Sequence, residues 1–398
     1  MPTRSLAALP GEVVSALQTT FPKKSADVFV PLHEPVFAGN EEAYVVDCIR
    51  TGWVSSVGSY VDALERKLEE YTGAKHAIAV VNGTAALHIA LLLAGAAEAD
   101  EVLIPALTFV ATANAVSYLG AVPHMVDVES TSLGVDGAKL ADYLKDIALV
   151  KERACYNQIT GRRIHSLVAM HAFGHPADLD VLREVCERFQ LKLIEDAAES
   201  LGSFYKGRHT GTYGDIAALS FNGNKIVTTG GGGAILTNNE EVGKMAKHLT
   251  TTAKLKHRWE YAHDTTGYNY RMPNLNAALG CAQLENLPAF LESKRALYHL
   301  YKDAFDRIPE VSVLSEPTYA KSNYWLQSLL LSESASDYRD SILEATNDAG
   351  FMTRPVWKLM SDLPMYRNSP SMPLTVAKNI EKRLINIPSG PSVGRWSR

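Results

Sequence analysis

A single lysine lies between two turn-prone segments in the stretch SFNGNKIVTTGGGG, residues 220–233. An apolar strand pattern ends at Phe221, Asn-Gly-Asn follows it, and four glycines come shortly after Lys225. An Asn-Gly pair between apolar runs is typical of a β-hairpin, in which Lys225 would be a solvated turn residue. A lysine just after a buried strand can instead be desolvated and lose its proton more readily, as a Schiff-base lysine must. This stretch alone leaves both interpretations open.

Two other strand patterns end in residues that could do chemistry. Asp196 follows the apolar run LKLIE, where a carboxylate is unfavourable unless a cation or a strong donor meets it. Asn82, Gly83 and Thr84 follow HAIAVV and open a helical pattern, and the free N–H groups of a helix N-terminus form an anion site. The simpler interpretations are a helix cap at Asp196 and an ordinary N-cap at Asn82.

An anion site, a buried carboxylate and an imine-forming lysine are together what pyridoxal phosphate requires. Its phosphate needs the helix N-terminus, its pyridine nitrogen needs an acid, and its aldehyde needs a lysine. Phe109, in PALTFVATA, follows a further strand pattern and could stack on the flat ring. One cofactor accounts for the helix N-terminus, Asp196, Lys225 and Phe109 together, whereas otherwise each would need its own structural explanation. The sequence therefore predicts a pyridoxal phosphate site.

Other phosphate and metal motifs fit less well. A P-loop has its glycines before the lysine, and here they follow it. A dinucleotide fingerprint would need G-x-G-x-x-G opening a helix after the first strand, and no such run is present there. The two histidines of HAFGH follow a strand pattern and flank a glycine, so a helical zinc pair is not expected. We predict no metal site.

Alternating strand and helix patterns must position these residues. Apolar strand patterns and amphipathic helix patterns alternate from about residue 40 to 221, which favours an α/β fold with a mostly parallel sheet flanked by helices. Ligands of such sheets lie beyond the carboxyl ends of the strands. A long helix over 274–305 then leads into shorter elements. We expect an N-terminal extension over 1–30, a large cofactor-binding domain over 31–275 and a small α/β domain over 276–398.

The composition excludes several classes of protein. The 398 residues carry a net charge of −5, so a nucleic-acid partner is not expected. No apolar run approaches the ~20 residues that span a bilayer, and the N-terminus lacks the continuous apolar region of a signal peptide. The four cysteines are far apart and form no CxxC pair. We expect a cytoplasmic protein with reduced thiols and no membrane partner.

The sequence resembles the sugar aminotransferases of the DegT/DnrJ/EryC1/StrS family, from about residue 31 to residue 366. The motifs that carry the resemblance are GWVSSVG, NGTAALHIAL, PALTFVATANAV, HAFGHPADLD, IEDAAESLGS, GDIAALSFNGNKIVTTGGGGAILT and GYNYRMPNLNAALG. The resemblance implies pyridoxal phosphate fold type I, like aspartate aminotransferase. It also implies a homodimer whose active sites are shared between the subunits.

The resemblance also implies roles for individual residues. Lys225 would hold the cofactor covalently, Asp196 would pair with its pyridine nitrogen, and Phe109 would stack on its ring. Gly83, Thr84 and Ser220 would bind the phosphate, with Asn269 reaching it from the other subunit. Glu199, where many members have glutamine, would lie near the phenolic oxygen, and a carboxylate there would have to be protonated or displaced.

We expect six further residues to line the sugar-nucleotide pocket: His33, Trp53, Ser55, Ser56, Arg271 and Lys358. The alternatives are core packing for Trp53, turn hydrogen bonds for the two serines, and surface charge for Arg271 and Lys358.

The resemblance implies amino transfer from L-glutamate to C4 of a nucleotide-linked 4-keto-6-deoxy sugar. The segments HEPVFAGNE and GWVSSVG favour UDP-2-acetamido-2,6-dideoxy-4-keto-hexose, of the bacillosamine or legionaminic acid type. The GNK…TTG pattern is shared with GDP-perosamine synthases, which aminate GDP-4-keto-6-deoxymannose and are the alternative. Related dehydratases have histidine at the position of Lys225. A non-catalytic regulatory protein of the same fold is a further alternative.

Overall fold

The computed structural model describes residues 6–22, 24–25 and 28–392. Its central element is a nine-stranded sheet with the order β1-β11-β10-β7-β6-β2-β3, extended from β6 by β5 and β4. The strands are β1 (His76–Val80), β2 (Glu101–Pro105), β3 (Val122–Val126), β4 (Ala148–Lys151), β5 (Ala154–Asn157), β6 (Arg163–Met170), β7 (Lys192–Asp196), β10 (Ile216–Ser220) and β11 (Gly233–Thr237). Strands β3, β2, β6, β7 and β10 are parallel, and β11 is antiparallel to both of its neighbours. This is the mostly parallel sheet that the alternating pattern predicted.

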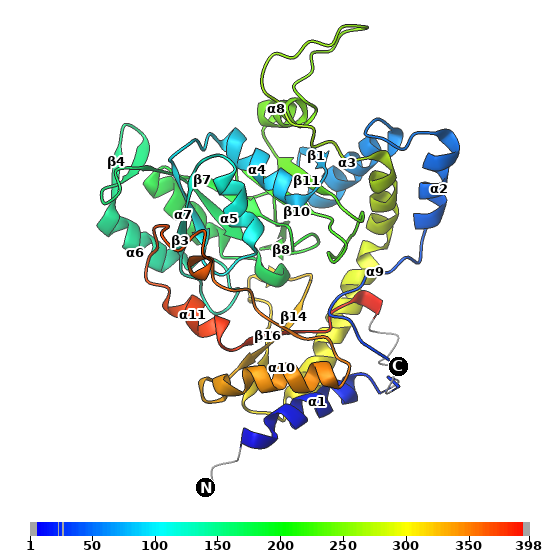
Figure 1. The fold of residues 1–398 in the computed structure, drawn as a ribbon, viewed down its shortest axis with the longest axis vertical. Coiled ribbons are helices and arrows are strands. Elements are labelled where there is room, and N and C mark those ends of the chain that lie inside the picture. The colour runs from blue at the N-terminus through cyan, green and yellow to red at the C-terminus, as the bar shows by residue number, and fades with distance from the viewer. Residues whose placement is uncertain (1–5, 23, 26–27, 393–398) are drawn as a thin grey trace.

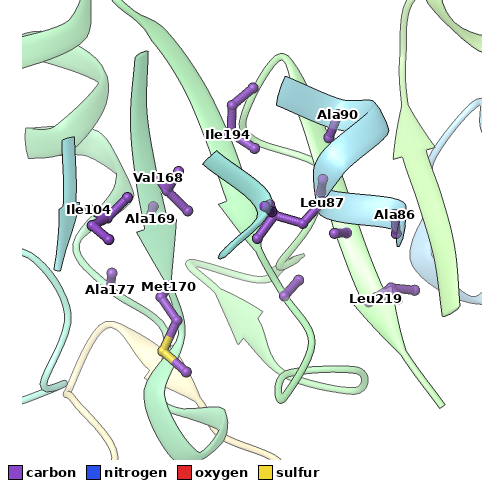
Figure 2. Close-up of a cluster of buried hydrophobic side chains, with 14 of the residues drawn as sticks. Ala86, Leu87, Ala90, Ile104, Val168, Ala169, Met170, Ala177, Ile194 and Leu219 are labelled. Carbon is purple, nitrogen blue, oxygen red and sulfur yellow. The ribbon is translucent and has the colours of Figure 1, made fainter. Parts of the chain in front are cut away.

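Helices flank this sheet (Figure 1). They are α2 (Glu41–Thr51), α3 (Ser59–Thr72), α4 (Gly83–Ala94), α5 (Val110–Ser117), α6 (Gly137–Ile147), α7 (Leu179–Phe189) and α8 (Glu240–Thr250). Figure 2 shows Leu87 of α4 among apolar side chains of the sheet, including Ile194 of β7 and Leu219 of β10. These three side chains are at most 3% exposed. The burial of α4 against the sheet therefore fixes where its N-terminus lies.

The long helix α9 (Asn274–Phe305) connects this region to a second, smaller one (Figure 1). The smaller region contains an antiparallel sheet of β12 (Val311–Val313), β14 (Gln327–Leu331), β16 (Leu384–Ile387) and β15 (Arg354–Pro355). Helices α10 (Arg339–Asp348) and α11 (Thr375–Glu381) follow β14 and β15. A separate three-stranded sheet joins β13 (Ala320–Lys321) to β8 (Phe204–Tyr205) and β9 (Arg208–His209), and so ties the two regions together.

The N-terminal helix α1 (Leu9–Thr20) packs on the smaller region of its own chain, beside α9 and α10 (Figure 1). Val13 and Leu17 share a hydrophobic cluster with Leu297 and Tyr301 of α9. Conversely, Leu359 and Met372 of the C-terminal part belong to the cluster of the large sheet. The division of the chain at residues 31 and 276 stays a prediction, but the packing crosses both boundaries.

Within the described part of the chain, no helix combines the length and the apolar character that a membrane span requires. The four cysteines are buried as free thiols. Segment 251–268 projects beyond α8 (Figure 1) and is closed by an antiparallel bridge between Lys254 and His263. Neither this projection nor the β4–β5 hairpin was predicted from the sequence.

Candidate active site

A cavity of about 320 Å³ lies at the carboxyl ends of β7 and β10, beside the N-terminus of α4. Its lining contains seven of the residues predicted from the sequence: Gly83, Thr84, Phe109, Asp196, Glu199, Ser220 and Lys225. These residues come from segments up to 142 positions apart (83 to 225), and the parallel sheet brings them to one edge. The cavity therefore occupies the position where α/β sheets bind their ligands.

Lys225 lies in the connection between β10 and β11. These strands are antiparallel neighbours, paired at Ser220 and Gly233, but residues 221–232 separate them, so Asn222 and Gly223 do not form a tight two-residue hairpin turn. The lysine is also not a solvated turn residue, because its side chain is only 12% exposed and lines the cavity. The strands are therefore antiparallel as the hairpin interpretation expected, but the lysine side chain is buried as the other interpretation requires.

Glu199 is the carboxylate that faces this lysine. Its Oε1 lies 3.2 Å from Lys225 Nζ, and its Oε2 accepts a hydrogen bond of 2.9 Å from the backbone N–H of Phe173. Burial raises the pKa of Glu199 to about 7, although the Lys225 ammonium acts in the opposite direction. The side chain can therefore hold or release a proton near neutral pH, directly beside the lysine amine.

Asp196, at the end of β7, is held by a chain of hydroxyl groups. The Thr112 hydroxyl donates to Asp196 Oδ2 at 2.8 Å, and the Thr108 hydroxyl lies 2.8 Å from Thr112 Oγ1. The backbone N–H of Ala198 donates to the other carboxylate oxygen at 3.3 Å. Asp196 is 6% exposed and lines the cavity. The hydrogen bonds from Thr112 and Ala198 therefore orient its carboxylate at the cavity wall, where it can contact a ligand.

The N-terminus of α4 and the end of β10 form a narrow cradle. A Cβ atom at Gly83 would lie 2.8 Å from the Cβ of Ser220, closer than side chains tolerate. Asn82 caps the helix by accepting a hydrogen bond of 2.7 Å from the N–H of Ala85. The first-turn N–H groups have no partner within a helix, so those of Gly83 and Thr84 can bind an anion together with the Ser220 hydroxyl.

Two tryptophans of the smaller region line the cavity, and the sequence had not indicated either. The ring of Trp325 lies over Lys225, with its centroid 3.8 Å from Nζ. Trp357 stacks on Phe173 at 4.8 Å between centroids and meets Phe109 edge-on at 6.4 Å. Trp325 lies 100 positions after Lys225 in the chain, so no local spacing could have linked them.

Five other predicted residues lie outside the lining of this cavity: Trp53, Ser55, Ser56, Asn269 and Arg271. The Arg271 guanidinium donates to the Asn269 side chain at 2.9 Å, and both residues are at least partly exposed. Asn274, three positions after Arg271, bonds the carbonyls of Trp53 and Ser55, so the turn containing Ser56 lies next to the 269–271 segment. The 269–271 segment also bridges the end of β1 at Val80, but neither it nor the 53–56 turn contributes to the lining of the cavity.

His33 and Lys358 also lie outside the cavity lining. Both ring nitrogens of His33 are buried without a hydrogen-bond partner in the described structure. Burial, and then the charges of Lys294 and Lys225, hold the pKa of His33 well below its usual range. Lys358 is 77% exposed and lies 3.7 Å from Glu381. Of the two interpretations of Lys358, pocket lining and surface charge, its position in a single chain fits surface charge.

The cavity fits the predicted cofactor. It presents a lysine amine, a hydrogen-bonded carboxylate and a cradle at a helix N-terminus, the three groups that pyridoxal phosphate requires. The cradle is too narrow for a Cβ at Gly83, which is what a closely held phosphate needs. Phe109, 50% exposed at the cavity wall, offers an aromatic face.

Comparisons with known proteins identify the family of this chain. The sequence pattern of the DegT/DnrJ/EryC1/StrS aminotransferase family matches residues 36–396. The GDP-perosamine synthase of Escherichia coli O157:H7 is 35% identical over 365 residues, covering 92% of this chain and 94% of the relative. That of Caulobacter vibrioides is 35% identical over 358 residues, covering 89% and 91%. The PLP form of Spr1654 from Streptococcus pneumoniae has the same fold, with a TM-score of 0.78, 23% identity and coverage of 91% and 93%. The chain therefore belongs to the DegT/DnrJ/EryC1/StrS aminotransferase family, as a sugar aminotransferase that depends on pyridoxal phosphate.

Proposed function

We propose that the chain transfers the amino group of L-glutamate to C4 of GDP-4-keto-6-deoxymannose, releasing 2-oxoglutarate and a GDP-linked 4-amino-4,6-dideoxy sugar. The observation that carries the aminotransferase chemistry is the convergence of Lys225, Asp196 and the α4 N-terminus on one cavity. The observation that supports the substrate is the 35% identity to two GDP-perosamine synthases along nine-tenths of the chain.

The identity to GDP-perosamine synthases revises an expectation from the sequence. The segments HEPVFAGNE and GWVSSVG favoured a UDP-linked acetamido sugar of the bacillosamine type. The two relatives compared above are instead GDP-perosamine synthases, so the alternative has the better support. Specificity for the base and for the C2 substituent depends on a few pocket residues, which short shared motifs do not report.

In this proposal Lys225 is the residue that moves protons. Its Nζ would hold the cofactor covalently at rest. Once the amino group of glutamate has replaced Nζ on the cofactor, the freed lysine amine would take the proton from Cα of glutamate, and in the second half-reaction it would deliver a proton to C4 of the sugar. Glu199 Oε1, 3.2 Å away, accepts a hydrogen bond from Nζ and so holds it in place between these steps. Because the pKa of Glu199 is raised to about 7, the pair can share a proton at neutral pH.

Asp196 and the cradle hold the cofactor in this proposal. Pyridoxal phosphate supplies an electron sink that stabilises negative charge on the carbon that loses its proton. Asp196, oriented by Thr112, accepts a hydrogen bond from the protonated ring nitrogen and so keeps that sink effective. Gly83, Thr84 and Ser220 bind the phosphate, and the wall containing Phe109 covers the ring.

We also propose a homodimer with shared sites. Asn269 is on the surface in a single chain, outside its own cavity. In the proposed dimer, Asn269 of the partner subunit reaches the phosphate, and the neighbouring Arg271 and 53–56 turn contact the sugar nucleotide. The proposed dimer thus gives the exposed Asn269 side chain a ligand contact, which it does not have in the cavity of its own chain.

The substrate proposal is tested with a panel of GDP-linked and UDP-linked 4-keto-6-deoxy sugars and L-glutamate labelled with nitrogen-15. We expect mass spectrometry and NMR to detect the label on C4 of the GDP-linked product. Labelling of the UDP-linked sugar alone would restore the first expectation. No amino transfer to any sugar, despite bound cofactor, would favour a non-catalytic protein of the same fold.

A further inference from the structure

Trp325 contacts both the side chain of Lys225 and the backbone next to it. Its ring centroid is 3.8 Å from Lys225 Nζ, and its indole N–H donates a hydrogen bond of 2.7 Å to the carbonyl of Asn224. Trp325 is 4% exposed and stacks on Phe173 with an interplanar angle of 23°. One rigid side chain therefore restrains the lysine at two points.

The backbone of Trp325 is in turn held by Lys294, from α9. Lys294 Nζ donates to the carbonyls of Trp325 at 3.0 Å, Tyr324 at 3.4 Å and Ser389 at 2.5 Å. An ammonium has three N–H donors, so these three carbonyls satisfy it completely. The side chain is 0% exposed. Burial lowers the pKa of Lys294 well below its usual range, whereas hydrogen bonds to acceptors favour the charged form of an amine.

Further contacts fix the same segment from the large region. Asn323 accepts a hydrogen bond of 2.8 Å from the N–H of Trp325 and donates to the carbonyls of Glu199 and Leu201, both at 2.9 Å. Tyr324, between them, has a φ of 49°, which is unfavourable for a tyrosine. Such a conformation persists where the surroundings impose it. The segment is thus built to hold Trp325 in one position.

An ammonium buried among carbonyls is a costly way to pack a helix against a loop. An apolar side chain of similar length would fill the space without the loss of hydration. What Lys294 adds is a defined position for two consecutive peptide groups, one of which carries the tryptophan that faces Lys225. The position of Trp325 is therefore fixed more tightly than packing of the fold alone requires.

We propose that Lys294 and Trp325 are positioning residues that act in series, Lys294 fixing Trp325 and Trp325 fixing the amine of Lys225 for proton transfer. The inference rests on the proposed function for the role of Lys225, but its structural part can be measured without cofactor. Trp325→Phe keeps an aromatic face and loses the N–H, and Trp325→Leu loses both. Lys294→Met removes the three hydrogen bonds. Lys302→Met, at an exposed lysine of the same helix, is the matched control.

The first measurement is hydrogen exchange of the cofactor-free protein. We expect amides of segment 222–229 to exchange about fivefold faster in Trp325→Phe and Lys294→Met, because one hydrogen bond to the Asn224 carbonyl is lost or loosened. Lys302→Met should match the wild type. Unchanged exchange of segment 222–229 in both variants would overturn the proposal. If Lys294→Met does not fold, Trp325→Phe decides.

The second measurement is the circular dichroism of the bound cofactor in the visible range, which reports its orientation on the lysine. We expect a reduced signal in Trp325→Leu and Lys294→Met, and glutamate-driven loss of colour about tenfold slower than in the wild type. Normal dichroism and normal rates in both variants would contradict the positioning role. If the wild-type protein binds the cofactor at a residue other than Lys225, the proposed function is wrong. The hydrogen-exchange measurement would still test whether Lys294 and Trp325 hold segment 222–229.

Discussion

Lys225 and Glu199 form a pair at the wall of the cavity, with 3.2 Å between Nζ and Oε1, and both side chains are largely withdrawn from water. The lysine is 12% exposed and the carboxylate 2%. Because burial favours the neutral acid while the ammonium favours the carboxylate, Glu199 titrates near neutrality, with a pKa of about 7. The protonation state of Glu199 therefore responds to pH near neutrality.

The raised pKa of Glu199 predicts a pH-dependent stability that Glu199→Gln removes. Between pH 4.5 and 7 the folded cofactor-free protein binds more protons than the unfolded chain, so its free energy of unfolding falls as pH rises. Relative to Glu199→Gln, the wild type should lose about 3 kcal/mol across this window. Denaturant unfolding of both proteins at pH 4.5 and pH 8 measures the difference. Parallel losses in the two proteins would refute the prediction.

Replacing Asp196 by asparagine should reduce turnover while leaving the cofactor bound. An amide does not keep the ring nitrogen protonated, so we expect kcat to fall on the order of 100-fold or more. Thr112→Val, which removes the hydroxyl that orients Asp196, should reduce kcat by about tenfold. Steady-state kinetics with cofactor occupancy measured by absorbance checks both. Equal kcat in Asp196→Asn and the wild type would exclude the assigned role.

The cradle predicts that a methyl group at Gly83 weakens cofactor binding. A Cβ there meets the Ser220 side chain at 2.8 Å, so the first turn of α4 and the end of β10 must move apart, which displaces the groups that would bind the phosphate. We expect the Kd for pyridoxal phosphate to rise by about tenfold or more, since several N–H contacts to a charged group are disturbed. Gly223→Ala is the matched control in the Lys225 loop, because a Cβ there meets nothing within 4 Å. The same Kd in both variants would argue against the cradle.

His175 predicts a loss of stability in acid. Its Nδ1 has no hydrogen-bond partner in the part of the chain that the structure describes, and burial lowers its pKa to about 4. Between pH 6.5 and 4 the unfolded chain binds the proton that the folded protein refuses, so stability falls as pH falls. By pH 5 this contribution reaches about 2 kcal/mol. His175→Gln should therefore lose less stability between pH 7 and pH 5, and an equal loss would contradict the prediction.

The proposed sharing of active sites between two subunits predicts complementation between two defective variants. Lys225→Ala lacks the amine of its own site, and Asn269→Ala would impair the site of the partner. In a mixed dimer one site receives both defects and the other receives neither. Refolding the two variants together at equal amounts should restore about one quarter of the wild-type activity. Activity no higher than that of Asn269→Ala alone would indicate that the sites are not shared.

The sequence predicted those site residues that lie at or directly after the end of a strand. Gly83, Asp196, Ser220 and Lys225 each come at or just after a buried strand, and because β1, β7 and β10 run in the same direction, these positions lie at one edge of the sheet. The long helix over 274–305 was also predicted with the bounds of α9, although Pro288 lies inside it.

What the sequence did not indicate depends on contacts between distant segments. Trp325 and Trp357 reach the cavity only because the smaller region folds back on the large sheet. The packing of α1 against α9 is of the same kind, since an amphipathic helix shows that one face is buried but not against what. The surface position of Asn269 and Arg271 in one chain likewise follows from tertiary structure alone.

The central claim is that Lys225 is the amine that binds the cofactor, and reductive trapping tests it most directly. The purified protein with bound pyridoxal phosphate is reduced with borohydride, digested and analysed by peptide mass spectrometry. We predict the cofactor on Lys225 and on no other lysine, because Lys225 is the lysine in the cavity lining beside Asp196. Attachment at the buried Lys294, or at any surface lysine while Lys225 stays unmodified, would contradict the account.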